Sequence, residues 1–391
     1  MIINNIKLAS RNLLKNKWIT AINVFGLTLG ITVSLMIFAY VRKEKTTDTF
    51  LPGYESIYAV TNNGESNFSQ NMVNLIKEKL PEAENVTYCC KEWSPQVFFT
   101  NNHKSYKIDK MLDADSCFFR VFQFEPVWGN PATALSTANK IVITQSLAAK
   151  IFGNENPVGK TVGYNSSYLQ NQQLEVGAVI RDLPQNASWD FEAVISLQTN
   201  YKISWYVEGM KSWAAQNYQA FCRANEHVSQ AALSKKIAAM PLDAVPDFYK
   251  KDIRLGLFPF SKVYFDFPDI DVRHGNSLAL SIIQIIAILI LLLACVNYIN
   301  LVTAQREKRS KNIGIIKTMG SSKQQVVQLL TVESGLVLSL TVVISLLLSM
   351  LLTDKMNAVT NSHFTFQTFL SGWNLLILMG IFLFTLIVTG V

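Results

Sequence analysis

Residues 153–161, GNENPVGKT, have the composition of a phosphate-binding loop. In such a loop the lysine contacts phosphate, the following hydroxyl contacts Mg²⁺, and backbone N–H groups face the phosphate from the start of a helix. The spacing here is different, because five residues separate Gly153 from Gly159 where the motif has four. The context is also inverted, since we expect Gly153 to end a helix and a β-like segment to follow Thr161. The sequence therefore argues against nucleotide binding by this loop.

Other side chains that could do chemistry are sparse. The motifs H-E-x-x-H, G-x-S-x-G and C-x-x-C do not occur in the chain. Cys89 and Cys90 are adjacent, which is poor geometry for a shared metal site. Cys117 and Cys222 could each find a partner in an oxidising compartment, or could pack as small buried hydrophobes, and the connectivity is not readable. Cys295 lies in an apolar segment and is expected to serve packing. We expect no catalytic group, no metal and no cofactor in this chain.

Four apolar segments dominate the hydropathy of the chain, whose hydrophobic fraction is 49% and mean hydropathy +0.20. The segments without a charged residue are 19–41, 276–305, 334–353 and 372–391. A helix needs roughly 20 apolar residues to cross the hydrocarbon core of a bilayer. The first segment is too long for a signal-peptide core and no A-x-A-like site follows it, so it is expected to be retained. The sequence therefore predicts an α-helical membrane protein with four transmembrane helices, the last one terminal or truncated. Buried core helices of a soluble protein are the disfavoured alternative.

The placement of basic residues predicts the orientation of the spans. Four cations and no acid precede the first span, at Lys7, Arg11, Lys15 and Lys17. The link between the second and third spans carries six Lys or Arg residues against Glu307 alone. Short loops rich in Lys and Arg stay in the cytoplasm, whereas a long loop translocates largely regardless of its charge. The N-terminus and residues 303–326 are therefore expected to be cytoplasmic. The net charge of +7 then reflects anionic lipid surfaces and gives no support to nucleic-acid binding.

The spans divide the chain into eight parts, with a large mixed α+β extracytoplasmic domain between the first two spans. The expected parts are an interfacial amphipathic helix 1–17, a first span 18–41, the outer domain 42–276, a second span 277–304, a cytoplasmic coupling region 305–326, a third span with a preceding helix 327–353, a short outer loop 354–371 and a fourth span 372–391. Within the outer domain the pattern predicts helices at 73–80, 145–152 and 229–240, and strands at 140–143, 174–180 and 217–222.

Two helical stripes near the N-terminus are expected to make contacts. Ile2, Ile6, Ala9 and Leu13 lie on one face of the first helix and Lys7, Arg11 and Lys15 on the opposite face, which is typical of a helix in the membrane plane with its cations toward lipid headgroups. A plain cytoplasmic extension of the first span is the alternative. Within that span Gly26, Gly30 and Ser34 repeat at four-residue spacing, which permits close helix approach within one chain or between two.

The segment 305–320, QREKRSKNIGIIKTMG, predicts a short amphipathic helix held between the second and third spans. Ile313, Ile316 and Met319 lie on one side, and Gly320 ends the helix. Ser322 is expected to begin the next helix, with Gln325 completing a capping box. The apolar side could dock on a cytoplasmic partner or could simply be buried against lipid.

Together these features resemble the FtsX/MacB-type permeases of ABC transporters. Residues 294–304 and 308–320 are similar to the second span and coupling helix of that family, and Glu333 matches an acidic residue usual before the third span. Residues 117–124, 129–135, 152–160 and 179–184 are similar to the MacB periplasmic core. Two departures stand out: Asn312 replaces a usual Glu, and the chain ends at Val391 where the family continues. The sequence is therefore expected to be the first half of a two-module permease, or a truncated product.

The resemblance implies a non-catalytic permease subunit of the bacterial inner membrane that couples a separate cytoplasmic ABC ATPase to the outer domain for export or extraction. ATP and Mg²⁺ would be bound by that partner. The ATPase-docking residues that it implies are Asn312, Ile313, Gly314, Ile315, Ile316, Lys317 and Met319, with Gly320 at the turn. Further implied partners are a second permease module (a homodimer, a heterodimer or a fused half), membrane lipids, and a periplasmic or outer-membrane protein. The alternatives are an FtsX-like regulator of a periplasmic cell-wall hydrolase and a ligand-sensing receptor. The substrate stays open.

Overall fold

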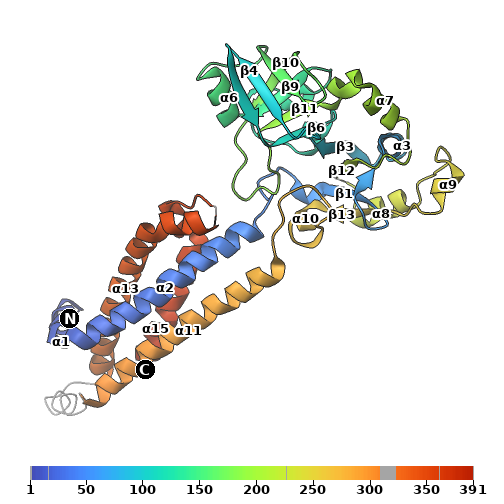
Figure 1. Cartoon of the computed structure of the whole chain (residues 1–391). Helices are drawn as coiled ribbons and strands as arrows, with labels where there is room; N and C mark the ends of the chain where they lie inside the picture. The colour runs from blue at the N-terminus through green and yellow to red at the C-terminus, as the bar shows by residue number, and fades with distance from the viewer. Residues whose placement is uncertain (1, 16, 226, 309–322, 361, 391) are drawn as a thin grey trace. The chain divides into compact units, whose positions relative to one another are not determined.

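The computed structural model describes residues 2–15, 17–225, 227–308, 323–360 and 362–390 (Figure 1). It divides the chain into two compact units. The chain's two ends, up to Lys45 and from Asn276 onward, form the membrane unit, and Thr46–Gly275 form the outer unit.

The membrane unit contains six described helices. They are α1 (Ile2–Lys15), α2 (Lys17–Lys45), α11 (Ser277–Lys308), α13 (Lys323–Thr360), α14 (Phe366–Phe369) and α15 (Gly372–Gly390). Among the described residues, α2, α11, α13 and α15 are each long and apolar enough to cross a membrane, which confirms the four-span prediction. The helix α13 continues to Thr360, about two turns beyond the expected end at residue 353. Most of the expected outer loop 354–371 is therefore helical, in α13 and α14.

The helix α2 occupies the centre of the membrane unit and packs against both α11 and α13. Its buried residues Leu27, Ile31 and Leu35 form a core with residues of α11, α13 and α15. Hydroxyl groups add hydrogen bonds between helices, since Ser345 Oγ donates to the Thr28 carbonyl at 3.3 Å and Thr32 Oγ1 donates to the Ser345 carbonyl at 3.4 Å. Such contacts matter in a bilayer, because lipid tails are as apolar as the side chains and burial gives no drive for helices to associate.

The outer unit is built on one mixed sheet. Its strand order is β13-β1-β12-β3-β6-β11-β8-β10-β9-β4-β5, with β2 beside β12 and β7 beside β10. Adjacent pairs are antiparallel except for β8 with β10 and β6 with β11. The strands are β1 (Ile57–Asn62), β2 (Asn67–Phe68), β3 (Ala83–Lys91), β4 (Val97–Asn101), β5 (Lys104–Ile108), β6 (Met111–Ala114), β7 (Pro126–Gly129), β8 (Lys140–Thr144), β9 (Thr161–Ser166), β10 (Gln172–Ile180), β11 (Ala193–Ser196), β12 (Tyr218–Ala224) and β13 (Leu255–Pro259).

The helices of the outer unit confirm the expected α+β class. They are α3 (Gln70–Lys79), α4 (Phe118–Val121), α5 (Pro131–Ala134), α6 (Gln145–Phe152), α7 (Ser204–Met210), α8 (Gln230–Ala238), α9 (Asp247–Lys250) and α10 (Phe260–Asp266), with single 3-10 turns at Tyr54–Ser56 and Leu197–Lys202. Thr144 caps α6 by accepting from the Leu147 N–H at 3.4 Å, and Gly153 ends it with φ +71°. The helix α3 starts earlier than predicted, because Ser69 caps it.

Aromatic rings fill the part of the core that supports the site described below. Phe122 and Trp189 are almost fully buried, and their ring centroids lie 5.0 Å apart. Phe122 also contacts Phe118, Phe221 and Phe260 at centroid distances of 5.0–5.2 Å. Trp189 therefore anchors the segment that precedes β11 to the centre of this core.

Candidate functional site

The predicted ATPase-docking residues, from Asn312 to Gly320, lie outside the described residues, as does the expected cap Ser322. The structure describes the two helices on either side of them, α11 as far as Lys308 and α13 from Lys323. The ends of these helices therefore define the candidate site.

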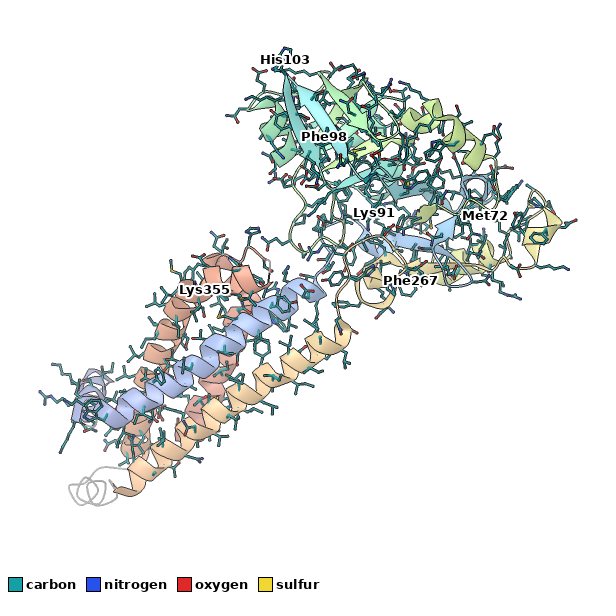
Figure 2. All side chains as sticks on the ribbon, viewed as in Figure 1. Met72, Lys91, Phe98, His103, Phe267 and Lys355 are labelled. Carbon is teal, nitrogen blue, oxygen red and sulfur yellow. The ribbon has the colours of Figure 1, made fainter. Side chains whose placement is uncertain are left out.

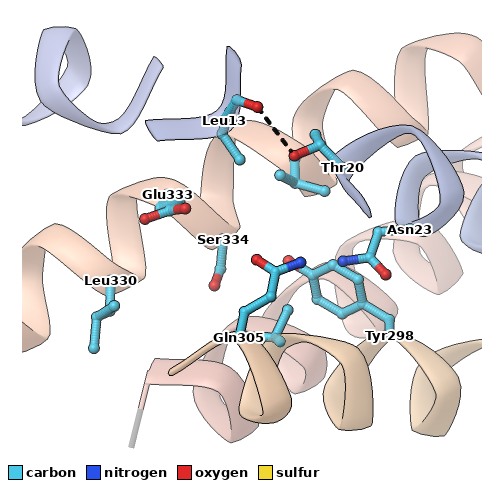
Figure 3. Close-up of a pocket in the computed structure, with 10 residues that line it drawn as sticks. Leu13, Thr20, Asn23, Tyr298, Gln305, Leu330, Glu333 and Ser334 are labelled. Atoms are coloured by element: carbon cyan, nitrogen blue, oxygen red, sulfur yellow. Dashed lines mark hydrogen bonds between the residues drawn. The ribbon is translucent and has the colours of Figure 1, made fainter. Parts of the chain in front are cut away.

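A polar cavity lies between the helix ends that flank the docking segment (Figure 3). The cavity is lined by Asn23 and Thr20 of α2, Tyr298 and Gln305 of α11, and Glu333 and Ser334 of α13, together with apolar residues of α11 and α13 and with Leu13 of α1. Its volume of about 30 Å³ has room for one or two water molecules. Polar and ionisable groups at membrane depth are costly and usually face a bundle interior or a water-filled cavity.

Helical periodicity explains why these side chains meet. Tyr298, Val302 and Gln305 lie at i, i+4 and i+7 on α11, so they share one face of that helix. Figure 3 shows the carboxamides of Asn23 and Gln305 converging on the Tyr298 ring. Asn23 is only 5% exposed, and its Oδ1 has no hydrogen-bond partner among the residues that the structure describes. This cavity is thus polar, and one of its buried amide oxygens lacks a hydrogen-bond partner.

The small residues Gly26, Gly30 and Ser34 face α11 of the same chain. The Ser34 hydroxyl donates to the Ala287 carbonyl at 2.9 Å. A Cβ at Gly30 would overlap the Cβ of Ala294. At this point the backbone of α2 therefore lies directly against a side chain of α11. A Cβ at Gly26 would lie 3.6 Å from Asn297 Nδ2, which is ordinary van der Waals contact.

The other end of the membrane unit is held by polar contacts from the last turn of α2. Lys43 Nζ donates to Ser362 Oγ at 2.8 Å and Arg42 Nη1 donates to Ser371 Oγ at 3.1 Å. Lys45 Nζ donates to Gln284 Oε1 of α11 at 2.8 Å. Arg42, Lys43 and Lys45 thus join α2 to α11 and to the α13–α15 connection.

Both chain connections of the outer unit meet on one short segment, Asn186–Ser188. The Asp48 N–H donates to the Asn186 carbonyl at 2.7 Å, and Asn186 Nδ2 donates to the Thr46 carbonyl at 2.6 Å. The Ser188 N–H donates to Asp48 Oδ1 at 2.7 Å. On the returning chain, the Arg273 N–H donates to the Ser188 carbonyl at 2.8 Å. Residues that directly follow α2 and directly precede α11 are therefore fixed to the same three residues.

Asp48 is the ionisable group at this junction. Its backbone is in the left-handed region with φ +61°, which Asp tolerates better than most residues. Burial raises its pKa from 3.8 to about 6, against the opposing effects of the Ser188 hydrogen bonds and the nearby Arg273 charge. The junction therefore carries a carboxylate that takes up a proton in mildly acidic conditions.

The residues that suggested other chemistry have structural roles. Gly153 ends α6 and Thr161 begins β9, as expected, and Lys160 pairs with Glu155. His103 lies in the β4–β5 turn at the rim of the outer unit (Figure 2).

The cysteines form neither disulfides nor a reactive site. All five cysteines are free, and burial raises the pKa of the Cys89, Cys90 and Cys222 thiols, which disfavours the nucleophilic thiolate. Within the described ranges no group of three or more His, Cys, Asp or Glu residues could hold a metal ion.

Two family models match the chain. Residues 20–240 match the MacB-like periplasmic core domain, and residues 284–391 match the FtsX-like permease C-terminal region. The comparison with curated proteins finds no match.

Three solved structures are similar to parts of the chain. A domain of a putative permease from Porphyromonas gingivalis is 21% identical, with a TM-score of 0.44, and the match covers 60% of this chain and 99% of that one. The periplasmic region of MacB from Actinobacillus actinomycetemcomitans is 14% identical, with a TM-score of 0.38 and coverages of 53% and 90%. The extracellular domain of the ABC-type transporter YknZ from Gram-positive bacteria is 14% identical, with a TM-score of 0.35 and coverages of 52% and 99%.

The contact at Gly30 predicts that Gly30→Ala destabilises the membrane unit. The added methyl group must push α2 from α11, and overpacking of this kind typically costs about 1–3 kcal/mol. Gly380→Ala on α15 is the matched control, because its added Cβ meets nothing within 4 Å. Thermal unfolding of the detergent-solubilised chain, followed by far-ultraviolet circular dichroism, should show a lower midpoint for the first variant only. Equal midpoints for both variants would contradict the close contact.

The raised pKa of Asp48 predicts a pH dependence of stability. Between pH 3.8 and about 6 the folded state holds a proton that the unfolded state has lost, so stability falls as pH rises through this window and is constant above it. The total loss is on the order of 3 kcal/mol. Asp48→Asn should remove this loss, whereas Asp243→Asn, at an exposed position, should not.

The measurement is denaturant unfolding of the full chain between pH 4 and about 7, with hydrogen exchange at the Ser188 amide as a local readout. If wild type and Asp48→Asn keep parallel curves over this range, Asp48 does not titrate as described.

Proposed function

The chain belongs to the family of ABC-transporter permeases that combine a MacB-like periplasmic core domain with an FtsX-like permease region, and we propose on this basis that it transmits mechanical work from an ATPase to its outer domain. Membership of the family implies an ABC ATPase partner and a dimeric arrangement. The work would be used for export or extraction of a substrate. ATP and Mg²⁺ would bind in the partner, and this chain would itself be non-catalytic.

The observation that supports the proposal most is the convergence of both membrane connections on Asn186–Ser188. The helix α2 runs without interruption to Lys45, and Thr46 and Asp48 follow directly. On the return, Arg273 binds the same segment only a few residues before α11 begins at Ser277. A movement of either helix along its axis would therefore act on one place in the outer unit, beside the Trp189 core.

The input would enter at the opposite ends of the same helices. We place ATPase docking on Ile313, Gly314, Ile315, Ile316, Lys317 and Met319, with Gly320 at the turn, between α11 and α13. These residues would be cytoplasmic, and the outer unit would face the outside of the bacterial inner membrane. The polar cavity lined by Asn23, Gln305 and Glu333 would let the helix ends shift, because its space is not filled by side chains.

A second permease module would pack on α11. This helix exposes a seam at alternating spacings of four and three residues, formed by Ile282, Ile286, Leu289, Leu293, Val296 and Asn300. Such a seam is the pattern by which two helices pack side by side, and an Asn within it fixes the register. Apolar exposure alone would suit lipid, but Asn297 and Asn300 are exposed amides that a bilayer leaves unsatisfied.

The test of the second module is cross-linking at the seam. In a chain whose native cysteines are replaced, Asn300→Cys should form a disulfide between two permease modules in native membranes. Val343→Cys on α13, which is also exposed, should not form one. A dimer cross-linked through residue 343 instead would move the interface to another helix.

The test of transmission uses two changes at opposite ends of the path. Gly314→Glu and Ile316→Asp should abolish co-purification of an ATPase that carries a Walker A motif, because each places a charge in the docking surface. Ser105→Asp on the exposed strand β5 is the control with the same added charge. Association that survives both changes would locate docking elsewhere.

The second change separates docking from transmission. Insertion of Gly-Gly-Ser between Lys45 and Thr46 should leave the ATPase bound and active but remove the ATP-dependent change in distance between spin labels at residue 105 of two modules. If the distance change persists with the insertion, α2 does not carry the movement.

A further inference from the structure

The helix α1 buries part of its apolar face within the protein, although Ile6 on that face is 40% exposed. Ala9 is fully buried and Leu13 is partly buried, and α1 packs mainly on α13. The hydroxyl of Thr20, near the start of α2, donates to the Leu13 carbonyl at 3.3 Å. The sequence favours contact with lipid for this face, and Ala9 and Leu13 are instead covered by protein. What α1 presents outward is therefore its opposite face.

That outward face is a stripe of cations. Lys7, Arg11 and Lys15 repeat at four-residue intervals, and all three are exposed. No ion pair joins any of them to an acidic residue in the part of the chain that the structure describes. Two exposed leucines flank the stripe, Leu8 at 48% and Leu14 at 75% exposure. Cations and apolar groups thus alternate across one accessible surface.

Exposed apolar side chains lie at the start of α2, close in sequence to these cations. Lys17 lies with its Nζ 6.0 Å from the centroid of the Trp18 ring, and Trp18 is 76% exposed. Ile22 and Phe25 follow Trp18 at i+4 and i+7 and are 59% and 66% exposed, so the three form one apolar strip. Tryptophan at the end of a transmembrane strip marks the level of the headgroups. The cations of α1 therefore lie next to the boundary of the bilayer.

We infer that Lys7, Arg11 and Lys15 bind the headgroup of an anionic phospholipid, whose acyl chains lie along Trp18, Ile22 and Phe25. The charges match the phosphate and headgroup anions, and the apolar strip matches the chains. An acidic protein surface would satisfy the charges but would leave Leu14 and Trp18 against water. Each cation near an anionic membrane surface strengthens binding by about fivefold, so three give about a hundredfold at low ionic strength.

The site goes beyond the proposed function, because it requires neither an ATPase nor movement. Since α1 packs on α13, a bound headgroup would also hold the N-terminal part of α13, close to the polar cavity lined by Glu333. Lipid composition would thereby influence the helix that follows the docking segment.

The test is native mass spectrometry of the full chain released from detergent with equal amounts of phosphatidylglycerol and phosphatidylcholine. Wild type should retain phosphatidylglycerol at least about tenfold more strongly, and retention should fall as NaCl is raised. The triple change Lys7→Gln, Arg11→Gln and Lys15→Gln should remove this preference. The control Lys104→Gln, Lys235→Gln and Lys251→Gln removes the same charge from exposed positions of the outer unit and should keep it. The swap Lys7→Arg, Arg11→Lys and Lys15→Arg should also keep it.

Three results would overturn the inference. One is equal retention of the two lipids by wild type, which needs no variant and so does not depend on folding of the triple change. Another is unchanged phosphatidylglycerol retention in a triple variant with wild-type helix content. The third is loss of ATPase association in that variant with lipid retention intact, which would make the stripe a protein-docking surface.

Discussion

The hydrogen bonds between Asp48 and the Asn186–Ser188 segment fix where the outer unit is attached to the rest of the chain. Asp48 lies near the start of the outer unit in a left-handed conformation, and both its N–H and its carboxylate are hydrogen-bonded. Arg273 then returns to the same segment. Trp189 follows Ser188 directly and is buried among aromatic rings, so the segment that binds Asp48 and Arg273 is anchored in the core of the outer unit.

Buried and half-buried carboxyl groups recur in the outer unit, and each accepts a hydrogen bond from a side chain or backbone group. Asn200 Nδ2 donates to Asp113 Oδ2 at 2.6 Å in the middle of the sheet, and the Tyr164 hydroxyl donates to Glu92 Oε2 at 3.0 Å. Burial and the neighbouring Glu92 raise the pKa of Asp113, as burial does for Asp48. Neither Asp113 nor Asp48 belongs to a recognised catalytic motif. Their shared property is that they join strands or connections that are far apart in sequence, so they specify the geometry of the unit rather than reacting.

Signals carried by neighbouring residues, such as helix caps and apolar runs, predicted much of this fold but little of the site. The helix α6 could be placed because Thr144 and Gly153 act within a few residues of its ends. The spans followed from composition alone. The junction could not be found in this way, because Asp48 and Ser188 are separated by 140 residues and neither has a distinctive neighbourhood. The C-terminal extension of α13 was missed because Asp354, Lys355 and Asn357 are polar, yet Asn357 accepts from the Phe364 N–H and closes the helix end. The docking residues 312–320 stay a prediction.

The contact of Gly30 with Ala294 has a consequence for stiffness. Two packed helices that can slide along each other resist bending only individually, whereas two helices that cannot slide bend as a single, stiffer unit. A glycine that lets the backbone of α2 sit against the side chain of α11, with Ser34 hydrogen-bonded to Ala287 one turn further, removes that freedom to slide. The pair would therefore deflect less under a sideways load from surrounding lipid, while a push along its length passes through with little loss.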